Sequence, residues 1–417
     1  MSITLAAAVH GVRCVRTDVH RIGYALQTHD GKGILMFFGD TEEEAQFRAE
    51  VRTWLEATLP TLPWPEPAGL EDRLVFFRQW QSLVHEAGYA GLSWPAEYGG
   101  RGASLGLQAV FAEELDRAGA PDRVNGIGEG FAGMTIIEHG TDAHKSRFLA
   151  PILRGEEIWC QLFSEPGAGS DLAGLQCRAE RDGDGYRITG QKVWTSRGQI
   201  ADWAILLART SGKRHDGITY FLFPMKQEGV TIRPLTQITG DAEFNEVFLE
   251  NAFVPDECIL GRVGDGWRLA KATLGYERVV IATGRMNIQK WLGELMELVR
   301  ESGQGEDPAV RARVADLWGR ALVHRLNGAR ALTQLGTGAP GPESSVGKLF
   351  MTPLASDIAD FALELGGLDA RVAPGAEMQG DGRWQRMSYM ARGMAIAGGT
   401  TQIQKNIVAE RVLGLPR

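Results

Sequence analysis

The sequence predicts an α+β protein in which a small β domain lies between two helical domains. Apolar side chains recur at helical spacing from about residue 41 to 154, and again from Trp267 to Leu413. Between these regions, short apolar segments alternate with Gly, Asp and Pro, a pattern typical of strands joined by turns. The expected strands are residues 186–189, 203–207, 218–223, 230–232 and 247–249.

Length and composition are those of a globular protein with a large core. The chain has 417 residues, 44% hydrophobic and 23% charged, which allows two or three domains. A net charge of −8 argues against nucleic-acid binding, because that function requires a basic surface. No run approaches the roughly 18 consecutive apolar residues that a membrane span needs. Four cysteines without a CxxC pair indicate a reducing, cytoplasmic environment.

The first 35 residues show no sustained helical or strand period, and we interpret them as an extension outside the fold. A start codon assigned too early would explain this extension, since Met36 offers an alternative start. A capping box at Thr41 and Glu44 then predicts the first helix, with apolar side chains at helical spacing from Phe47 to Leu55. The expected domains are an N-terminal helical domain (36–157), a middle β domain (158–264) and a C-terminal helical domain (265–417) after the extension at 1–35.

The segment LFSEPGAGSD at residues 162–171 is the strongest local signal for a ligand site. Gly167 and Gly169 allow the backbone to approach a flat or phosphorylated ligand, and Ser164 and Ser170 supply hydroxyl donors. On spacing alone, an ordinary turn between a helix and a strand explains the segment equally well.

A second segment, GQKVWTS at residues 190–196, places an aromatic ring beside two hydroxyls. Trp194, with Thr195 and Ser196, can cover and hydrogen-bond a planar ring system. Taken alone, this pattern is more often an ordinary amphipathic strand.

Together, the two segments resemble motifs of the acyl-CoA dehydrogenase family. Residues 164–171 match the family's TEPGAGSD, and residues 192–196 match its K-x-W-(x)-T/S. Residues 399–404, GTTQIQ, match its GT-x-x-I-Q, and the tail at 409–414 is also similar. The resemblance covers about residues 38–417. It implies the acyl-CoA dehydrogenase fold, with an N-terminal helical domain, a middle β-barrel domain and a C-terminal helical bundle.

The resemblance also implies FAD as the cofactor and an acyl-CoA as the substrate. Ser164 would bond the pyrimidine side of the flavin, Trp194 would pack against the isoalloxazine, and Ser196 would reach toward N5. Ser170 would lie near the pantetheine arm of the substrate. The expected cofactor-binding residues are Leu162, Ser164, Gly169, Trp194, Ser196, Gly366, Gly367, Thr400 and Gln402.

The implied reaction, α,β-dehydrogenation to the trans-2-enoyl-CoA, needs a carboxylate base for the α-proton, while flavin N5 takes the β-hydride. Many family members carry this Glu just before the Gly-Thr of the C-terminal motif, where this chain has AGG at residues 397–399. Isovaleryl- and long-chain-type members take it instead from a Glu-Arg helix segment, which LGYERVVIA matches at Glu277 and Arg278.

The resemblance therefore assigns Glu277 as the base and Arg278 as a substrate-binding residue. The alternative for Glu277 is a solvated glutamate of an amphipathic helix. Gly398 would leave space for the substrate, and its backbone N–H would help to bind the thioester oxygen.

Two motifs that complete the family's FAD site across a subunit interface are altered here. Residues 307–319 contain no Arg-x-x-Phe-Gly, and the segment LELGGLD has Asp369 where a Gly is usual. This pattern resembles bacterial subunits that act on steroid side-chain thioesters with a paralogous partner. The resemblance thus implies either an α2β2 assembly or a homo-oligomer in which Arg311, Arg313 or Arg320 serves the phosphates.

The resemblance implies a role in fatty acid or steroid degradation, with an electron-transferring flavoprotein or similar acceptor. Two other functions stay open, namely a flavin monooxygenase or nitroalkane oxidase on the same fold, and a supporting subunit of a heteromer. Glu277 argues against a monooxygenase, which needs no such base. The intact flavin-facing segments argue against a purely supporting subunit.

Overall fold

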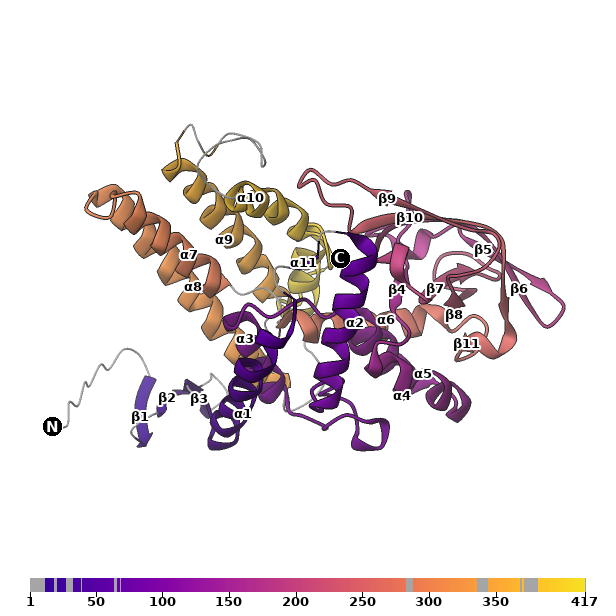
Figure 1. Cartoon of the computed structure of the whole chain (residues 1–417), viewed down its shortest axis with the longest axis horizontal. Coiled ribbons are helices and arrows are strands. Elements are labelled where there is room, and N and C mark those ends of the chain that lie inside the picture. The colour runs from indigo at the N-terminus through magenta and orange to yellow at the C-terminus, as the bar shows by residue number, and fades with distance from the viewer. Residues whose placement is uncertain are drawn as a thin grey trace.

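The structure is a computed structural model whose main body combines helices with a mixed sheet; in Figure 1 the sheet lies at the right, the C-terminal helices at the upper left, and most of the N-terminal helices in the lower middle. This arrangement confirms the predicted α+β class. The residues that the structure describes are 12–18, 21–27, 33–38, 40–63, 66–67, 69–282, 288–335, 344–367, 370 and 382–416. No helix among them is long and apolar enough to cross a membrane.

The first helical part is built around buried aromatic side chains, among them Trp80 and Trp94. Its first helix starts at the predicted capping box, in which Thr41 and Glu44 each bond the other's backbone N–H. The second helix ends just before Gly88, whose φ of 72° is typical of a glycine that follows a helix C-cap. The helices are α1 (Glu42–Thr58), α2 (Leu70–Glu86), α3 (Leu105–Arg117), α4 (Met134–His139) and α5 (Asp142–Arg154), with a π-helical turn η3 (Gly128–Gly133) before α4.

The middle part is an eight-stranded mixed sheet with the order β11-β8-β7-β5-β6-β10-β9, and β4 pairs in parallel with β7. All five predicted strand segments lie within it. The sequence missed β5 because the segment RAERD is largely charged, and missed β4 and β11 because they are short. The strands are β4 (Trp159–Leu162), β5 (Arg178–Asp182), β6 (Gly185–Ser196), β7 (Trp203–Arg209), β8 (Ile218–Pro224), β9 (Val230–Leu235), β10 (Phe244–Pro255) and β11 (Ile259–Leu260).

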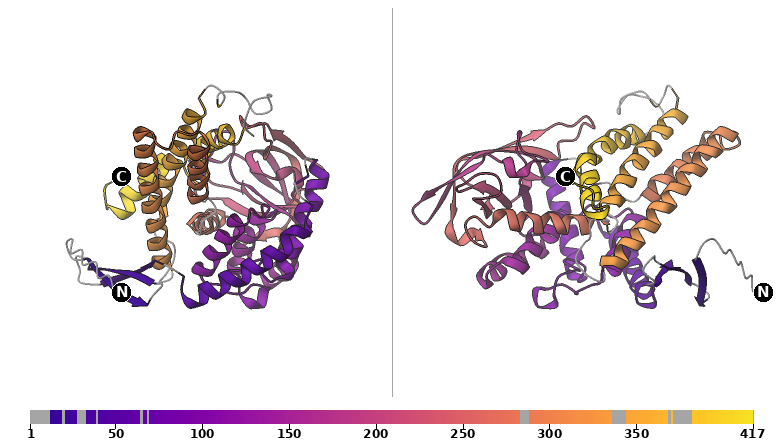
Figure 2. Two further views of the ribbon diagram at one scale, coloured as in Figure 1. Left: turned by 60° about the vertical axis from the view of Figure 1, so that its left-hand side comes forward. Right: turned by 180° about the vertical axis from the view of Figure 1, so that it is seen from behind.

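The C-terminal part is a helical bundle with a second hydrophobic core, which includes Leu295, Leu317 and Leu354. Helix α9 is central to it, because it contacts α6, α7, α8, α10 and α11. Figure 2 shows the bundle beside the sheet from two further directions. The helices are α6 (Gly266–Ala282), α7 (Ile288–Glu301), α8 (Pro308–Leu335), α9 (Ser344–Leu365), α10 (Arg383–Met394) and α11 (Thr401–Ile407), followed by a π-helical turn (Val408–Val412).

A separate three-stranded antiparallel sheet lies at the N-terminal edge of the molecule, near α1 (Figure 1). It consists of β1 (Val12–Asp18), β2 (Arg21–Gln27) and β3 (Gly33–Phe38), and β3 contacts α8. The sequence analysis found no strand period here, and that was wrong. Each alternating run is only about seven residues long, so no pattern persists along the segment. Strand β3 also crosses the domain boundary expected at residue 36.

Candidate active site

The two segments that we expect to face the flavin lie side by side, joined by backbone and side-chain hydrogen bonds. The N–H of Val193, on β6, donates to the carbonyl of Ser164 at 3.0 Å. Lys192 Nζ reaches across to the carbonyl of Phe163 at 3.1 Å and to Glu165 Oε1 at 2.8 Å. The structure therefore brings together the residues that the sequence predicted at positions 162–171 and 190–196.

The ion pair between Lys192 and Glu165 is buried, and both side chains make additional hydrogen bonds. The exposed fractions of the two side chains are 0% and 6%. The other donors to the Glu165 carboxylate are the backbone N–H groups of Gln176, at 2.5 Å, and Cys177, at 2.9 Å. A buried ion pair persists only when such additional bonds offset the loss of hydration. This pair was not predicted from the sequence, in which the only signal for it is a lysine within a strand pattern.

Trp194 adopts a backbone conformation that large side chains avoid. Its φ is 61°, and it lies at a β-bulge where Val193 and Trp194 oppose the single residue Glu246. The indole remains 62% exposed and contacts the Phe244 ring edge-on at 6.0 Å. Strained backbone of this kind is concentrated at functional sites. The bulge thus presents an aromatic ring at the surface of β6.

The described residues around Trp194 fit a planar, polar-edged cofactor such as flavin. The Ser164 and Ser196 hydroxyls have no partner among the described residues, so both are available to a ligand. A Cβ placed at Gly167 or Gly169 would meet nothing within 4 Å, which shows that the loop backbone is open. Leu162, by contrast, is fully buried, so its side chain supports the loop from beneath. Ser170 is exposed at the end of this loop.

The third motif lies on the bundle side, and the hydrogen bonds of the described residues do not join it to the first two. Thr400 caps α11, and its hydroxyl accepts from the N–H of Ile403 at 3.3 Å. Gln402 is exposed on the first turn of that helix. Gly398 and Gly399 precede it with φ values of 62° and 93°, a conformation that favours glycine.

The loop that contains Gly398 is held by two side chains that the sequence analysis did not single out. Lys348, on α9, donates to the carbonyls of Ala397 and Gly399. Gln404, one turn into α11, donates to the Gly398 carbonyl at 2.9 Å. Both side chains are buried, with exposed fractions of 6% and 5%.

Gly366 and Gly367 form the end of α9. The N–H of Gly366 donates to Ala362, the N–H of Gly367 donates to Glu364, and Gly367 has a φ of 59°. These bonds give both glycines a helix-terminating role. Asp369 lies outside the described residues.

Helix α6, which carries Glu277, lies at the junction of all parts of the main body. It contacts α4 and η3 of the first helical part, β8 of the sheet, and α8 and α9 of the bundle. The side chains of Glu277 and Arg278 lie outside the described residues. Both residues belong to the C-terminal half of α6, and their roles in the reaction stay predictions.

A buried cluster of hydroxyls fixes α6 one turn before Glu277. Thr273 Oγ1 lies 3.0 Å from Thr135 Oγ1 and 3.1 Å from the Tyr220 hydroxyl. Burial raises the pKa of Tyr220, so this hydroxyl stays neutral and can donate. Leu269 and Thr273 are both buried, and Glu277 continues their four-residue spacing along the helix.

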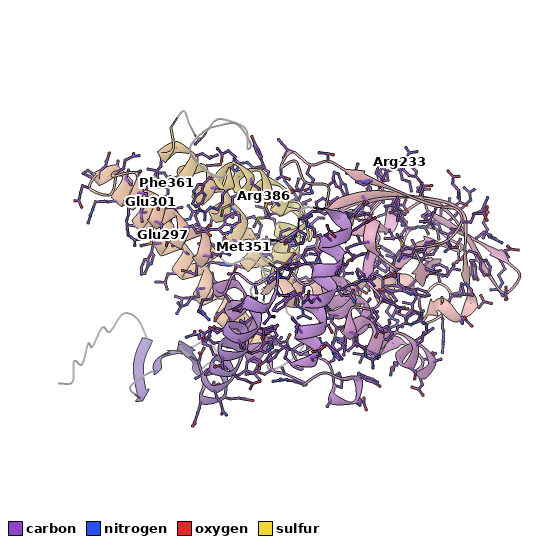
Figure 3. All side chains as sticks on the ribbon, in the orientation of Figure 1. Arg233, Glu297, Glu301, Met351, Phe361 and Arg386 are labelled. Atoms are coloured by element: carbon purple, nitrogen blue, oxygen red, sulfur yellow. The ribbon has the colours of Figure 1, made fainter. Side chains whose placement is uncertain are left out.

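The bundle and the sheet are also joined next to Trp194. Arg386, labelled in Figure 3, lies on α10, and its Nη1 is 2.5 Å from Asp241 Oδ2 in the turn between β9 and β10. Burial acts to raise the pKa of Asp241, but the hydrogen bonds from Arg386 and Thr239 and the nearby arginine charges together outweigh it and hold the pKa below its usual value. This turn leads into Phe244, the aromatic partner of Trp194.

The arginines expected to serve the phosphates are partly engaged within the chain. Arg320 lies 2.7 Å from Asp357, and Arg313 lies over the Phe361 ring at 5.9 Å. Arg311 is more exposed, with Glu306 at 4.0 Å. Arg320 and Arg313 are thus at least partly occupied by partners within the chain, whereas Arg311 is more open.

Comparison with known proteins agrees with this geometry. Three family models match in order: "Acyl-CoA dehydrogenase, N-terminal domain" at residues 41–156, the middle domain at 160–252 and the C-terminal domain at 264–413. The fold and the matches define an FAD-dependent oxidoreductase. Because the three models cover most of its length, the chain belongs to the acyl-CoA dehydrogenase family.

Individual relatives give a finer picture. The chain is 41% identical over 388 residues to acyl-CoA dehydrogenase IpdE1 of Mycobacterium tuberculosis, an alignment that covers 90% of this chain and 99% of the relative. Among solved structures, the Tcur3481-Tcur3483 steroid ACAD has a TM-score of 0.80 at 27% identity, covering 91% of this chain and 99% of that one. The ChsE4-ChsE5 complex from M. tuberculosis has a TM-score of 0.79 at 29% identity, with the same coverage.

Proposed function

We propose that this enzyme oxidises an acyl-CoA thioester to the trans-2-enoyl-CoA, with Glu277 as the base that removes the α-proton. The observation that carries the proposal is the position of Glu277 on α6, the helix that contacts every part of the main body. Bound FAD would supply the acceptor for the β-hydride at its N5.

The residues of the chain divide between cofactor and substrate. Ser164, Trp194 and Ser196 hold the flavin ring, since they lie on two hydrogen-bonded segments that offer free hydroxyls and an exposed indole. Leu162 and Gly169 shape the loop beneath it. The remaining cofactor contacts are assigned to Gly366, Gly367, Thr400 and Gln402.

On the substrate side, the backbone N–H of Gly398 binds the thioester oxygen. This N–H has no acceptor among the described residues, and Gly398 carries no side chain that would cover it. A donor at this place stabilises the negative charge that develops on the oxygen while Glu277 takes the proton. Ser170 and Arg278 contact the CoA portion of the substrate.

The substrate class that we infer is a CoA thioester of a ring-containing, steroid-derived acid. Support comes from the similarity to a solved complex that is named as a steroid ACAD. Gly398 also leaves room where other family members carry a glutamate. Electrons would pass on to an electron-transferring flavoprotein or a similar acceptor in the cytoplasm.

The test is an anaerobic titration of the FAD-loaded enzyme with straight-chain, branched and ring-containing acyl-CoAs. We expect bleaching of the flavin by at least one ring-containing substrate, and a product that is two hydrogens lighter. A flavin that no acyl-CoA bleaches would contradict the proposal. Oxygen-dependent formation of an oxygenated product would favour the monooxygenase instead.

A second candidate function is that of the catalytic subunit in an α2β2 heteromer. It is favoured by the absence of Arg-x-x-Phe-Gly and by the engagement of Arg320 with Asp357. The names of two similar solved structures also each contain two proteins. The outer faces of the bundle expose Trp318 and Met390, which suits contact with another subunit.

Purification of the chain alone tests this assembly by light scattering and by the amount of FAD per chain. The heteromer predicts a poorly loaded protein that gains FAD and activity on addition of the partner. One tightly bound FAD per chain in an active homo-oligomer would exclude it.

A further inference from the structure

We propose that Lys348 is a positioning residue that aims the backbone N–H of Gly398 at the thioester oxygen. This inference rests on the proposed function. It deepens that function, because it identifies what holds the donor in place.

The geometry follows from the two carbonyls that Lys348 binds. Its Nζ donates to the oxygens of Ala397 and Gly399. In a trans peptide the C=O and the following N–H point in opposite directions. The N–H groups of Gly398 and Thr400 must therefore point away from Lys348, out of the bundle core. Neither of these N–H groups has an acceptor among the described residues.

Gln404 completes the restraint on the same loop. Its Nε2 donates to the Gly398 carbonyl at 2.9 Å, so all three carbonyls from Ala397 to Gly399 are held by buried donors. A Cβ at Gly399 would lie 2.8 Å from Gln404 Nε2, so only glycine allows this approach. The loop has no freedom to turn its carbonyls toward the substrate.

The cost of burying Lys348 argues that this lysine has a specific role. It is 6% exposed and lies in the second turn of α9, so its ammonium group is largely removed from water. A buried ammonium requires strong acceptors, which the two carbonyls provide. The same contact polarises both peptide groups and makes their N–H groups better donors.

Helix α9 connects this loop to the proposed base. It contacts α11, which follows the loop, and α6, which carries Glu277. A donor fixed by Lys348 is thus held relative to the base by one helix. Loss of the ammonium would let the 397–399 loop rotate, so the thioester oxygen would be less polarised and the α-proton less acidic.

The test uses Lys348→Met, which keeps the length of the side chain and removes its charge. Lys405→Met, which removes an exposed lysine of α11, is the matched control. The first readout is the carbonyl stretch of a bound enoyl-CoA labelled with carbon-13 at the thioester carbon, measured by infrared difference spectroscopy. We expect the stretch in Lys348→Met to lie closer to that of the free thioester than in the wild type, and Lys405→Met to match the wild type.

The second readout is flavin reduction at saturating acyl-CoA. We expect flavin reduction in Lys348→Met to be slower by about 10- to 100-fold. Complete loss of one oxyanion donor lowers the rate about 10²- to 10³-fold, and in this variant the Gly398 N–H is displaced but still present. The isotope effect from an α-deuterated substrate should rise, while half-saturation and FAD content stay close to wild type. Lys348→Arg should recover part of the rate.

An unchanged carbonyl stretch in Lys348→Met would overturn the inference. If Lys348→Met does not fold, Gln404→Met is measured in the same way, and a wild-type stretch in that variant overturns the inference equally. Failure of the proposed function has a different signature: the wild-type flavin would not be reduced, whereas the carbonyl stretch would still respond to Lys348.

Discussion

Lys192 and Glu165 form an ion pair across the two flavin-facing segments, with Nζ 2.8 Å from Oε1 and both side chains buried. The lysine precedes Trp194 by two residues, and the glutamate directly follows Ser164. This pair therefore fixes the distance between an indole and a hydroxyl that we assign to the same ring system. The contribution of this ion pair to the stability of the fold can be measured separately from catalysis.

Lys192→Met should destabilise the folded protein strongly. The substitution leaves the charge of Glu165 buried with backbone donors only, a situation that typically costs about 3–5 kcal/mol. The free energy of unfolding, from urea denaturation followed by circular dichroism, measures this loss. FAD retention should fall in the same variant, because Ser164 loses its anchor.

The matched control is Lys226→Met, at an ion pair with Asp202 in which the lysine is 70% exposed. An exposed pair contributes at most about 1 kcal/mol. If both variants lost the same free energy of unfolding, burial of the Lys192–Glu165 pair would add nothing to its stabilising effect.

Trp194→Gly should weaken flavin binding without lowering the stability of the apoprotein. Glycine relieves the positive φ of 61°, and the exposed indole contributes little to the core, so the apoprotein should melt at or near the wild-type temperature. Loss of the ring should weaken flavin binding by about 3- to 10-fold, as expected for one aromatic contact. Equilibrium dialysis of FAD measures the affinity. If Trp194→Gly bound FAD as tightly as the wild type, Trp194 would not be part of the flavin site.

Glu114 should make the first helical part sensitive to acid. It belongs to α3, and its carboxylate is bonded by Arg48 and Arg52 of α1. Burial acts to raise its pKa, but hydrogen bonds from Arg52, Arg117 and Arg48 lower it to about 2. Because the pKa is lower in the folded state than the ordinary 4.5, protonation favours unfolding. The stabilisation is present above pH 4.5 and is lost as the pH falls toward 2.

Unfolding measured by denaturant between pH 7 and pH 3 checks this expectation. Glu114→Gln should be less stable at neutral pH and should lose less stability on acidification than the wild type. Glu113→Gln, at a neighbouring side chain that is 55% exposed, serves as the control and should keep the wild-type pH dependence. An identical pH dependence in Glu114→Gln would contradict the assignment.

The local parts of the fold were predictable from the sequence. The capping box at Thr41 and Glu44 has its signal within three residues, and residues 218–223 form a short, mostly apolar run between Gly217 and Pro224, which favours a buried strand. The small N-terminal sheet was missed because its strands are short. Ile22, Tyr24 and Leu26 alternate in β2, a signal that becomes meaningful only once its partners are known.

The site was predictable only as far as short motifs extend. Resemblance supplied Ser164, Trp194 and Glu277, but it did not indicate that Lys192 reaches Glu165, 27 residues away, or that Lys348 reaches Gly399, 51 residues away. Such contacts depend on how β6 meets the loop after β4 and how α9 meets α11. Tertiary packing decides both, and no local pattern encodes it.

The N-terminal sheet offers a test of the domain boundary at residue 36. We expect a chain that begins at Met36 to bind FAD and to melt with the full-length protein, because the described part of the main core begins at Phe47. Thermal melting of both forms compares them. A loss of several degrees would show that β1 and β2 support α8 or α1.

The central claim, that Glu277 is the base of an acyl-CoA dehydrogenase, is tested most directly by Glu277→Gln. The control is Glu297→Gln, an exposed glutamate on α7 at the far side of the bundle (Figure 3). The measurement is the anaerobic rate of flavin bleaching by a substrate acyl-CoA, at matched FAD content. We predict a loss of at least ~10²-fold for Glu277→Gln and none for Glu297→Gln. Bleaching of the Glu277→Gln enzyme at the wild-type rate would contradict the account.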